Sequence, residues 1–473
     1  MITNYKYSEN KIDWVLVLLL FLLLGLGFMN LYSSDYVEYD KRDFFQTDYG
    51  KQLIWIIVTI VFAIIIFFTE TVFFTISANL IYIIIIGLLV LVLIVGKTVN
   101  GSKSWMGIGG LGLQPAEFAK LAISLFLARY ISNKKIDLSD LNIKNLFNLL
   151  VFIVIPIFFI LLQPDFGTVL SFTALLIVFY RFGISSLIPI YIFIMFLVFV
   201  FSIKISFLYI FLTLSAIGFL FFMISLNNKK LFIRIILISI IVLVLVFVGS
   251  KFLKYSQDKI LFYTAIIVSL YSLILTLMKR QNKATLVVFF YFSSLVTLYA
   301  SDLMLHKVLK QHHRNRIEVL FNEKIDPQGI GYNLRQSKIA IASGGFWGKG
   351  YLRGTQTKLN FVPAHNTDFI FCTLVEEFGW FGSFVLFVLY FVLIYRILQR
   401  AEQQVSMFSR VYGYCVASFF IVHIILNIAM VIGLFPVIGI PLPFFSYGGS
   451  AILSFSIMLL IFIKLDSERN LNL

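Results

Sequence analysis

The sequence predicts an all-α polytopic membrane protein with about fourteen transmembrane helices. Two observations lead to this. The chain of 473 residues is 60% hydrophobic and only 13% charged, a balance that soluble globular proteins do not have. Many of its apolar runs reach the roughly 18 residues that a helix needs to cross the hydrocarbon core of a bilayer, while the alternation typical of strands is absent.

Each span is predicted from the length of its apolar run, and polar or Gly/Pro-rich residues mark where it ends. The short spans between 167 and 203 leave two arrangements open, separate crossings or a merged or re-entrant segment. The stretch 184–301, nearly all Ile, Leu, Phe and Val, is expected to be lipid-facing scaffold. In chain order the candidate spans are 13–33, 52–69, 72–96, 115–131, 147–163, 167–181, 184–203, 205–226, 231–249, 259–278, 283–301, 368–397, 410–435 and 441–464.

The distribution of charge predicts the orientation. A formal net charge of +15 would suggest nucleic acid in a soluble protein. Here Lys and Arg collect in the short loops RYISNKK, NNKK, MKRQNK and YRILQR, as the positive-inside rule expects of cytoplasmic loops. The chain is therefore predicted to run N-in and C-in, with the polar loop 302–367 outside and with no nucleic-acid partner. The two cysteines lie in apolar segments and indicate neither a disulfide framework nor a metal site. The first apolar run is expected to be a span and not a removable signal peptide.

Two polar clusters interrupt the N-terminal spans. In GSKSWMGIGGLGLQPAEFAK, residues 101–120, Trp105 fits an interfacial anchor as well as a substrate contact. Glu117 and Lys120 lie three residues apart on one helix face and can pair inside the bundle. In QPDFGT, Asp165 stands between two apolar runs, which fits a tight surface turn as well as a functional site.

The loop 302–367 is longer than compact folds commonly tolerate unless the loop is functional. It is cationic, with Arg314, Arg316 and Lys338 among its basic residues. An ordinary solvated loop is one explanation, but positive charge is disfavoured on the outside, so an anionic partner such as a lipid phosphate or pyrophosphate is predicted. The segment NLRQSKIAIAS, which contains Gln336, is predicted to form an amphipathic helix on the membrane surface.

The loop ends in FVPAHNTDFIF, which brings one carboxylate, Asp368, to the first turn of a membrane helix. Asp368, or Asn366 or Thr367 beside it, could simply cap that helix. A charge at the rim of the hydrocarbon is also commonly functional, and the same residue can serve both purposes. Glu376 and Glu377 follow two turns later inside an apolar helix, so at least one must face the bundle interior or water.

A last cluster, GLFPVIGIPLPFFSYGGS, carries three prolines and four glycines at a span junction and predicts broken helix surrounded by protein or a cavity. Taken together, these strings resemble the SEDS family (shape, elongation, division and sporulation), which includes RodA, FtsW and SpoVE proteins. The pieces that carry the resemblance occur in the family's order: GSKSWM with LQPAEFAKL, QPDFGT, HHRNR with DPQGIGYNLRQSKIAIASGG, GTQTKLNFVPAHNTDFIF, VEEFG and PLPFFSYGGS. The segments QSKIAIASGG and GTQTKLNFVP resemble RodA sequences more closely than FtsW sequences.

The chain departs from the family pattern in two ways. The family has about ten spans, and about four more are predicted here within 184–301. The family commonly reads Pro-Glu-x-His-Thr-Asp before an aromatic pair, whereas this chain has Ala364 in place of the Glu and Asn366 in place of the His, with His365 displaced by one. The Asp is kept as Asp368. The resemblance therefore divides the chain into 1–183 and 368–473 as family-like membrane helices, 184–301 as additional helices, and 302–367 as an extracellular catalytic loop.

The resemblance implies a peptidoglycan glycosyltransferase of the bacterial cytoplasmic membrane, active on its outer face in cell elongation, shape or division. Members polymerise lipid II, a disaccharide-pentapeptide on undecaprenyl pyrophosphate, together with a class B penicillin-binding protein. Asp368 is then the catalytic base of an inverting transfer. Charge on the leaving pyrophosphate would be neutralised by Arg or Lys or by a divalent cation such as Mg²⁺ or Mn²⁺, and the sequence does not decide between them. The substrate-binding candidates are Arg314, Arg316, Lys338, Gln336, Trp105, Glu117, Lys120, Asp165, Glu377 and Ser446.

Two other classes of function fit the same sequence. Many spans, broken helices and carboxylates inside the membrane also describe a secondary transporter or a lipid II flippase. A non-catalytic scaffold for a penicillin-binding protein is the third class, in which the altered Ala364–Asn366 segment has cost the activity.

Overall fold

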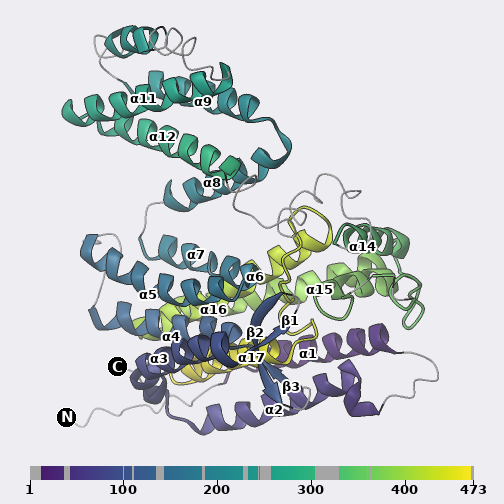
Figure 1. Ribbon diagram of the computed structural model, residues 1–473. Helices are drawn as coiled ribbons and strands as arrows, with labels where there is room; N and C mark the ends of the chain where they lie inside the picture. Colours follow the sequence, from purple (N-terminus) through teal and green to yellow (C-terminus); the bar gives the residue numbers. More distant parts are fainter. Residues whose placement is uncertain are drawn as a thin grey trace, which may run out of the picture. The chain divides into compact units, whose positions relative to one another are not determined.

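The computed structural model describes residues 12–36, 43–99, 101–108, 111–134, 143–183, 187–226, 233–242, 244, 257–303, 330–359, 361–362 and 364–469. Within these ranges the chain is almost entirely helical, as predicted (Figure 1). Nine of the described helices are long and apolar enough to cross a membrane, and four shorter apolar helices accompany them. The total of fourteen spans stays a prediction.

The helices of the first part of the chain are α1 (Trp14–Asp35), α2 (Asp48–Phe68), α3 (Thr71–Val95), α4 (Pro115–Lys134), α5 (Ile143–Leu162), α6 (Phe166–Ser171) and α7 (Ala174–Arg181), with a 3₁₀ turn η1 at Phe44–Gln46. They are followed by α8 (Leu187–Lys204), α9 (Phe207–Ser225), α11 (Gln257–Met278), α12 (Asn282–Leu303), α14 (Ile330–Gly344), α15 (Ile370–Glu402), α16 (Met407–Val431) and α17 (Gly449–Ser467).

The expectation of helices alone misses one small sheet. Strands β1 (Lys97–Val99), β2 (Ser102–Ile108) and β3 (Leu111–Leu113) form an antiparallel sheet in the order β1-β2-β3 between α3 and α4. Gly101, with φ of 84°, connects β1 to β2, and Ser102 donates to the carbonyl of Gln163, so the polar run that precedes α4 is folded against the bundle instead of trailing into solvent.

The chain divides into two compact units, residues 1–185 with 322–473 and residues 186–321. In the first unit α17 is the central helix, with 94% of its most apolar stretch buried. It packs against α2, α4, α16 and α1, and the aromatic side chains of Phe444, Phe455 and Phe462 are fully buried around it. Three serines of α17, Ser450, Ser454 and Ser456, are also buried, as expected because polar side chains of a membrane helix face the interior of the bundle.

The second unit has cores of its own. Helix α12 packs against α8, α9 and α11 around Phe211, Phe262 and Leu298, and a smaller cluster forms around Phe222 and Leu275. Most of the remaining apolar side chains of this unit are exposed, as expected for helices that face lipid.

One end of the first unit is held by charge. Asp13, the N-cap of α1, accepts hydrogen bonds from Arg396 and Arg400 of α15, and Arg400 also lies 3.7 Å from Asp466 near the end of α17. Burial disfavours the ionised form of Asp13, but the bonds from Arg400 and Arg396 outweigh it and hold the pKa of Asp13 below its usual value. The start of α1 and the ends of α15 and α17 therefore share one side of the bundle.

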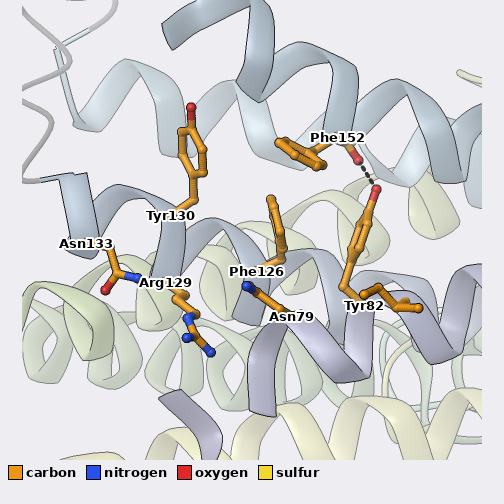
Figure 2. Close-up of a pocket in the computed structure, with 8 residues that line it drawn as sticks. Asn79, Tyr82, Phe126, Arg129, Tyr130, Asn133 and Phe152 are labelled. Carbon is orange, nitrogen blue, oxygen red and sulfur yellow. Dashed lines mark hydrogen bonds between the residues drawn. The ribbon is translucent and has the colours of Figure 1, made fainter. Parts of the chain in front are cut away.

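A proline inside α5 removes a backbone hydrogen bond, and a side chain of a neighbouring helix replaces it. Pro156 has no N–H, so the carbonyl of Phe152, four residues earlier, lacks its helical donor. The hydroxyl of Tyr82, from α3, donates to that carbonyl at 2.7 Å (Figure 2). A membrane helix tolerates proline where a neighbouring helix supplies the missing donor in this way.

We expect Tyr82→Phe to lower the free energy of unfolding by about 1–3 kcal/mol, because it leaves a buried carbonyl without a partner. In a Pro156→Ala background residue 156 regains an N–H, and Tyr82→Phe should then cost well under about 1 kcal/mol. Unfolding of the four proteins in detergent measures this double-mutant cycle. An equal cost in both backgrounds would show that Tyr82 does not compensate for Pro156.

Candidate functional site

Asp368 lies in a tight turn, 364–369, directly before α15. The carbonyl of Ala364 accepts hydrogen bonds from the N–H groups of Thr367 and Phe369, and Ala364 takes a left-handed backbone conformation with φ of 57°. Helix α15 begins one residue too late for Asp368 to be its N-cap, since that position belongs to Phe369. The side chain of Asp368 is half-buried, at the end of the bundle opposite to the Asp13 cluster along α1.

Two residues of this turn attach it to α1 and α2. The ring nitrogens of His365 face the backbone carbonyls of Val362 and Ser34, at 2.7 and 3.2 Å. The side-chain oxygen of Asn366 accepts from the Ser34 hydroxyl at 2.6 Å, and its amide donates to Asp48 at the start of α2 at 2.9 Å. Neither residue caps α15, and the displaced His365 and Asn366, which stands in place of the family's His, both serve as structural ties.

A third tie comes from α16. The amide of Asn427 donates to the backbone carbonyl of Asp368 at 2.9 Å and to that of Ile440 at 2.6 Å. It thus joins the Asp368 turn to the loop 432–448. Gly439 of this loop has φ of 71°, and a Cβ added there would lie 3.4 Å from the carboxylate of Asp368. The loop therefore lies directly beside the carboxylate, and glycine permits both the backbone conformation and the close approach.

A described cation beside this loop is on α14. A Cβ added at Gly433 would lie 2.7 Å from the Nζ of Lys338, so Lys338 and Asp368 border the same loop. Helix α14 packs on α15 and α16, with Ser337 buried and donating to the carbonyl of Val431 at 2.9 Å, and its position on the membrane surface stays a prediction. Gln336 is half-buried on this helix. Arg314 and Arg316 lie outside the described residues.

Helix α15 is broken at Gly379, where φ is 65°. The segment after α14 fits into this break: the N–H groups of Trp380 and Phe381 donate to the carbonyls of Gly345 and Phe346. A side chain at position 379 would collide with the backbone of residues 346–348. The span predicted as one continuous helix is therefore two helical segments with the loop held between them.

Glu376 and Glu377 of α15 are both buried, whereas the sequence predicted that at least one of them would face the bundle interior or water. Glu376 accepts from Lys349 at 2.7 Å and from the backbone N–H groups of residues 355, 356 and 357, so it fixes the loop above it. Glu377 accepts from the hydroxyl of Ser33 on α1, and its other carboxylate oxygen has no hydrogen-bond partner among the described residues. Glu377 stays a candidate for substrate binding.

The predicted pair on α4 forms deep inside the bundle. Lys120 Nζ donates to Glu117 at 2.7 Å, and both side chains are almost fully buried. The same Nζ lies 3.0 Å from Nε2 of His423 on α16 and 4.5 Å from the ring centre of Phe455. Because the lysine donates, His423 accepts through Nε2 and donates through Nδ1 to the carbonyl of Pro441, at 3.3 Å. The pair is thus connected to the loop that borders Asp368.

Three of the polar clusters meet in space. The side-chain amide of Gln114 donates to Asp165 at 2.7 Å, and the backbone N–H of Gln114 donates to Ser450 at 2.8 Å. Asp165 also caps α6 by accepting from the N–H of Thr168. Asp165 is therefore more than a surface turn, because it joins two clusters that lie 51 residues apart.

Two further candidates serve the local structure. The ring of Trp105, in β2, lies against Gly112 of β3, where an added Cβ would approach it to 2.9 Å. Ser446 is buried and accepts from the N–H of Leu442 at 2.8 Å, which closes the turn of the loop 432–448.

Asn427 and His423 were not predicted as site residues. They lie four residues apart on one face of α16, inside an otherwise apolar helix. Polar side chains within a membrane span are commonly functional, and this signal could have identified them from the sequence.

Comparison with known proteins agrees with this geometry. The family model described as "Cell cycle protein", which groups FtsW, RodA and SpoVE proteins, matches residues 13–210 and 261–471. The unmatched stretch, 211–260, lies within the second unit. Over 441 residues the chain is 28% identical to the protein named "Peptidoglycan glycosyltransferase RodA" of Treponema pallidum, covering 93% of this chain and 94% of that protein.

Solved structures share the fold. One, described as "Structural coordination of polymerization and crosslinking by a peptidoglycan synthase complex", aligns with a TM-score of 0.62 at 21% identity over 97% of this chain and 98% of the other. The rod shape determining protein RodA of Thermus thermophilus aligns with a TM-score of 0.56 at 19% identity over 97% of each chain. With the family match covering most of the sequence and the fold shared throughout, this chain belongs to the FtsW, RodA and SpoVE family of cell cycle proteins.

Proposed function

We propose that this protein is a peptidoglycan glycosyltransferase that polymerises lipid II into glycan strands. The observation that carries the proposal is the position of Asp368, a half-exposed carboxylate on a turn tied to α1, α2 and α16. The Treponema pallidum relative, which matches nearly the whole chain, is named for this activity. A partly exposed base on a turn that is held from three sides suits a reaction in which positioning supplies much of the rate.

In the proposed reaction Asp368 takes the proton from the 4-hydroxyl of the acceptor sugar. The hydroxyl oxygen forms a bond to the anomeric carbon of the donor, the bond from that carbon to the pyrophosphate oxygen breaks, and the configuration inverts. The lipid pyrophosphate leaves with the electron pair, so it needs charge neutralisation more than it needs a proton. Lys338, beside the loop that borders Asp368, is a candidate for this role, with Arg314 and Arg316 as further candidates.

A divalent cation stays a prediction. Among the described residues no group of three or more His, Cys, Asp or Glu side chains gathers to hold a metal ion. Mg²⁺ commonly binds through only one or two carboxylates together with substrate phosphates, so Asp368 and a bound pyrophosphate have the donor chemistry that such an ion takes.

The site is proposed to face outward, with the N- and C-termini in the cytoplasm. Asp13, Arg396 and Arg400 lie at one end of α1, and Ser34, which contacts the Asp368 turn, lies at the other. The positive-inside rule favours the arginine end as cytoplasmic. This orientation supports substrate entry from the outer leaflet, with the lipid tail in the bilayer and the head group in water.

The proposed partner is a class B penicillin-binding protein, which would crosslink the product. The likeness to a solved peptidoglycan synthase complex supports it at the level of the fold. The direct test of function is purified protein with lipid II, assayed for glycan polymer with and without the partner. Movement of labelled lipid II across a vesicle membrane without polymer would favour a flippase instead.

Asn427 is proposed to position the base. We expect Asn427→Leu, which removes both hydrogen bonds at nearly constant volume, to lower kcat about tenfold or more with little change in KM, because the Asp368 turn loses its tie to the loop 432–448. Lipid II polymerisation kinetics measure this. Ser418→Ala, a buried polar replacement on the same helix without a hydrogen-bond partner in the described structure, should leave kcat unchanged. Equal loss in both variants would argue against a positioning role.

A further inference from the structure

The described part of the chain contains a cavity far from Asp368, between α3, α4 and α5. Its volume is about 410 Å³, within the range of about 300–1,000 Å³ typical of ligand sites. It lies near the start of α3 and the end of α4. Lys464 and Glu468, at the end of α17, bond to Phe67 and Thr71, so the start of α3 shares the side of the Asp13 cluster. In the proposed orientation the cavity is at the level of the inner leaflet.

The cavity has an apolar wall and a polar side (Figure 2). The rings of Tyr82, Phe126 and Phe152 pack on one another, with centroids 4.5–6.1 Å apart. Arg129 and Asn133, one turn apart on α4, contribute polar groups at the other side. A ligand that fits must therefore have an apolar part and a polar part.

Asn79 completes the polar side. It lies on α3, a helix whose other residues around the cavity are mostly apolar, and its side chain is exposed. Its amide forms no hydrogen bond with any described residue, and neither does that of Asn133. A primary amide in this position is costly in hydrocarbon unless a polar ligand meets it.

The charge of Arg129 has no acidic neighbour among the described residues that line the cavity. The guanidinium of Arg129 donates from Nη1 to the backbone carbonyls of Thr75, at 2.8 Å, and Ile76, and these bonds fix its position across the seam between α3 and α4. It has no carboxylate partner within the described residues, and no acidic side chain lines the cavity. Its Nε and Nη2 donors are not used in the described structure, so a phosphate can be bound there.

We propose that this cavity is a binding site for an anionic phospholipid of the inner leaflet. The phosphodiester meets the guanidinium of Arg129, polar groups of the head group meet the amides of Asn79 and Asn133, and the start of an acyl chain lies along the rings. A zwitterionic lipid fits less well, since none of the described residues that line the cavity is acidic and could pair with its ammonium group. Basic pockets between membrane helices on the cytoplasmic side have the chemistry that anionic head groups need.

The competing role for Arg129 is a structural clamp between α3 and α4. The two roles differ in what they predict. A clamp lowers stability regardless of which lipid is present. A lipid site makes stability depend on the class of lipid, because a ligand that binds only the folded state stabilises it by mass action.

The test uses the full-length protein in detergent, titrated with phosphatidylglycerol, phosphatidylcholine or inorganic phosphate, with native mass spectrometry for binding and apparent Tm for stabilisation. Phosphatidylglycerol should bind to the wild type and raise Tm, and the other two should not. Arg129→Gln should weaken phosphatidylglycerol binding about tenfold or more. Arg280→Gln removes one exposed charge from a loop predicted to be on the same side of the membrane and should bind as the wild type does. Asn79→Leu should also weaken phosphatidylglycerol binding. Because leucine is tolerated on a lipid-exposed helix face, this variant tests the site even if the Arg129→Gln protein misfolds.

Three outcomes would overturn the proposal. The first is unchanged phosphatidylglycerol binding in both Arg129→Gln and Asn79→Leu. The second is equal stabilisation by phosphatidylcholine, which would indicate ordinary lipid contact. The third is stabilisation by inorganic phosphate at the same site, which would make the ligand a soluble anion. None of these outcomes bears on polymerisation by Asp368.

Discussion

Asp368→Asn is expected to reduce lipid II polymerisation by about 10²–10⁴-fold, the contribution that a general base commonly makes. Asparagine has nearly the same size and keeps the backbone carbonyl that Asn427 binds, so the turn 364–369 should persist. The amide cannot take the proton of the acceptor hydroxyl. Measurement of polymer formed by the purified variant from lipid II tests the assignment directly.

The matched control is Asp43→Asn, an exposed carboxylate that lies before α2 and accepts a hydrogen bond from the side chain of Gln46 at 3.2 Å. It removes the same charge near the same end of the bundle and should retain full activity. Both variants should unfold at the temperature of the wild type. Polymerisation at the wild-type rate by a folded Asp368→Asn protein would exclude Asp368 as the base.

Glu117→Leu is expected to cost about 3–5 kcal/mol of unfolding free energy, because it leaves the charge of Lys120 buried without its partner. The double replacement Glu117→Leu with Lys120→Met should recover most of that cost, since an apolar pair of similar volume replaces a buried ion pair with little penalty. Chemical denaturation in detergent measures both. Glu402→Leu, at a half-exposed ion pair with Arg181, is the control and should cost no more than about 1 kcal/mol.

Activity of the double variant then separates structure from function. We expect polymerisation to stay reduced even when stability returns. His423 loses the donor that fixes its ring and, with it, its hold on the carbonyl of Pro441 in the loop that borders Asp368. Full activity in the stable double variant would show that the pair serves only the fold. If the double variant did not regain stability, the cost of Glu117→Leu would not come from the unpaired charge of Lys120 alone.

Much of the candidate site could be read from the sequence because the residues that form it stand out locally. Asp368 is a charge at the end of an apolar run, and Glu117 with Lys120 are charges inside one. The membrane class, the helical fold and the family follow from the same contrast between long apolar runs and polar motifs. The small sheet at 97–113 was missed because short strands rich in glycine carry no clear alternation.

The sequence alone determined which residues are unusual for a membrane protein, because the cost of a polar group in hydrocarbon is a local property. Only the tertiary structure decided what each of them does. Glu376 and Glu377 are neighbours in the chain, yet one holds the loop through Lys349 and the other meets Ser33 of α1. Their partners lie 27 and 344 residues away, and which groups meet depends on how the helices pack and where α15 breaks, which no local pattern records.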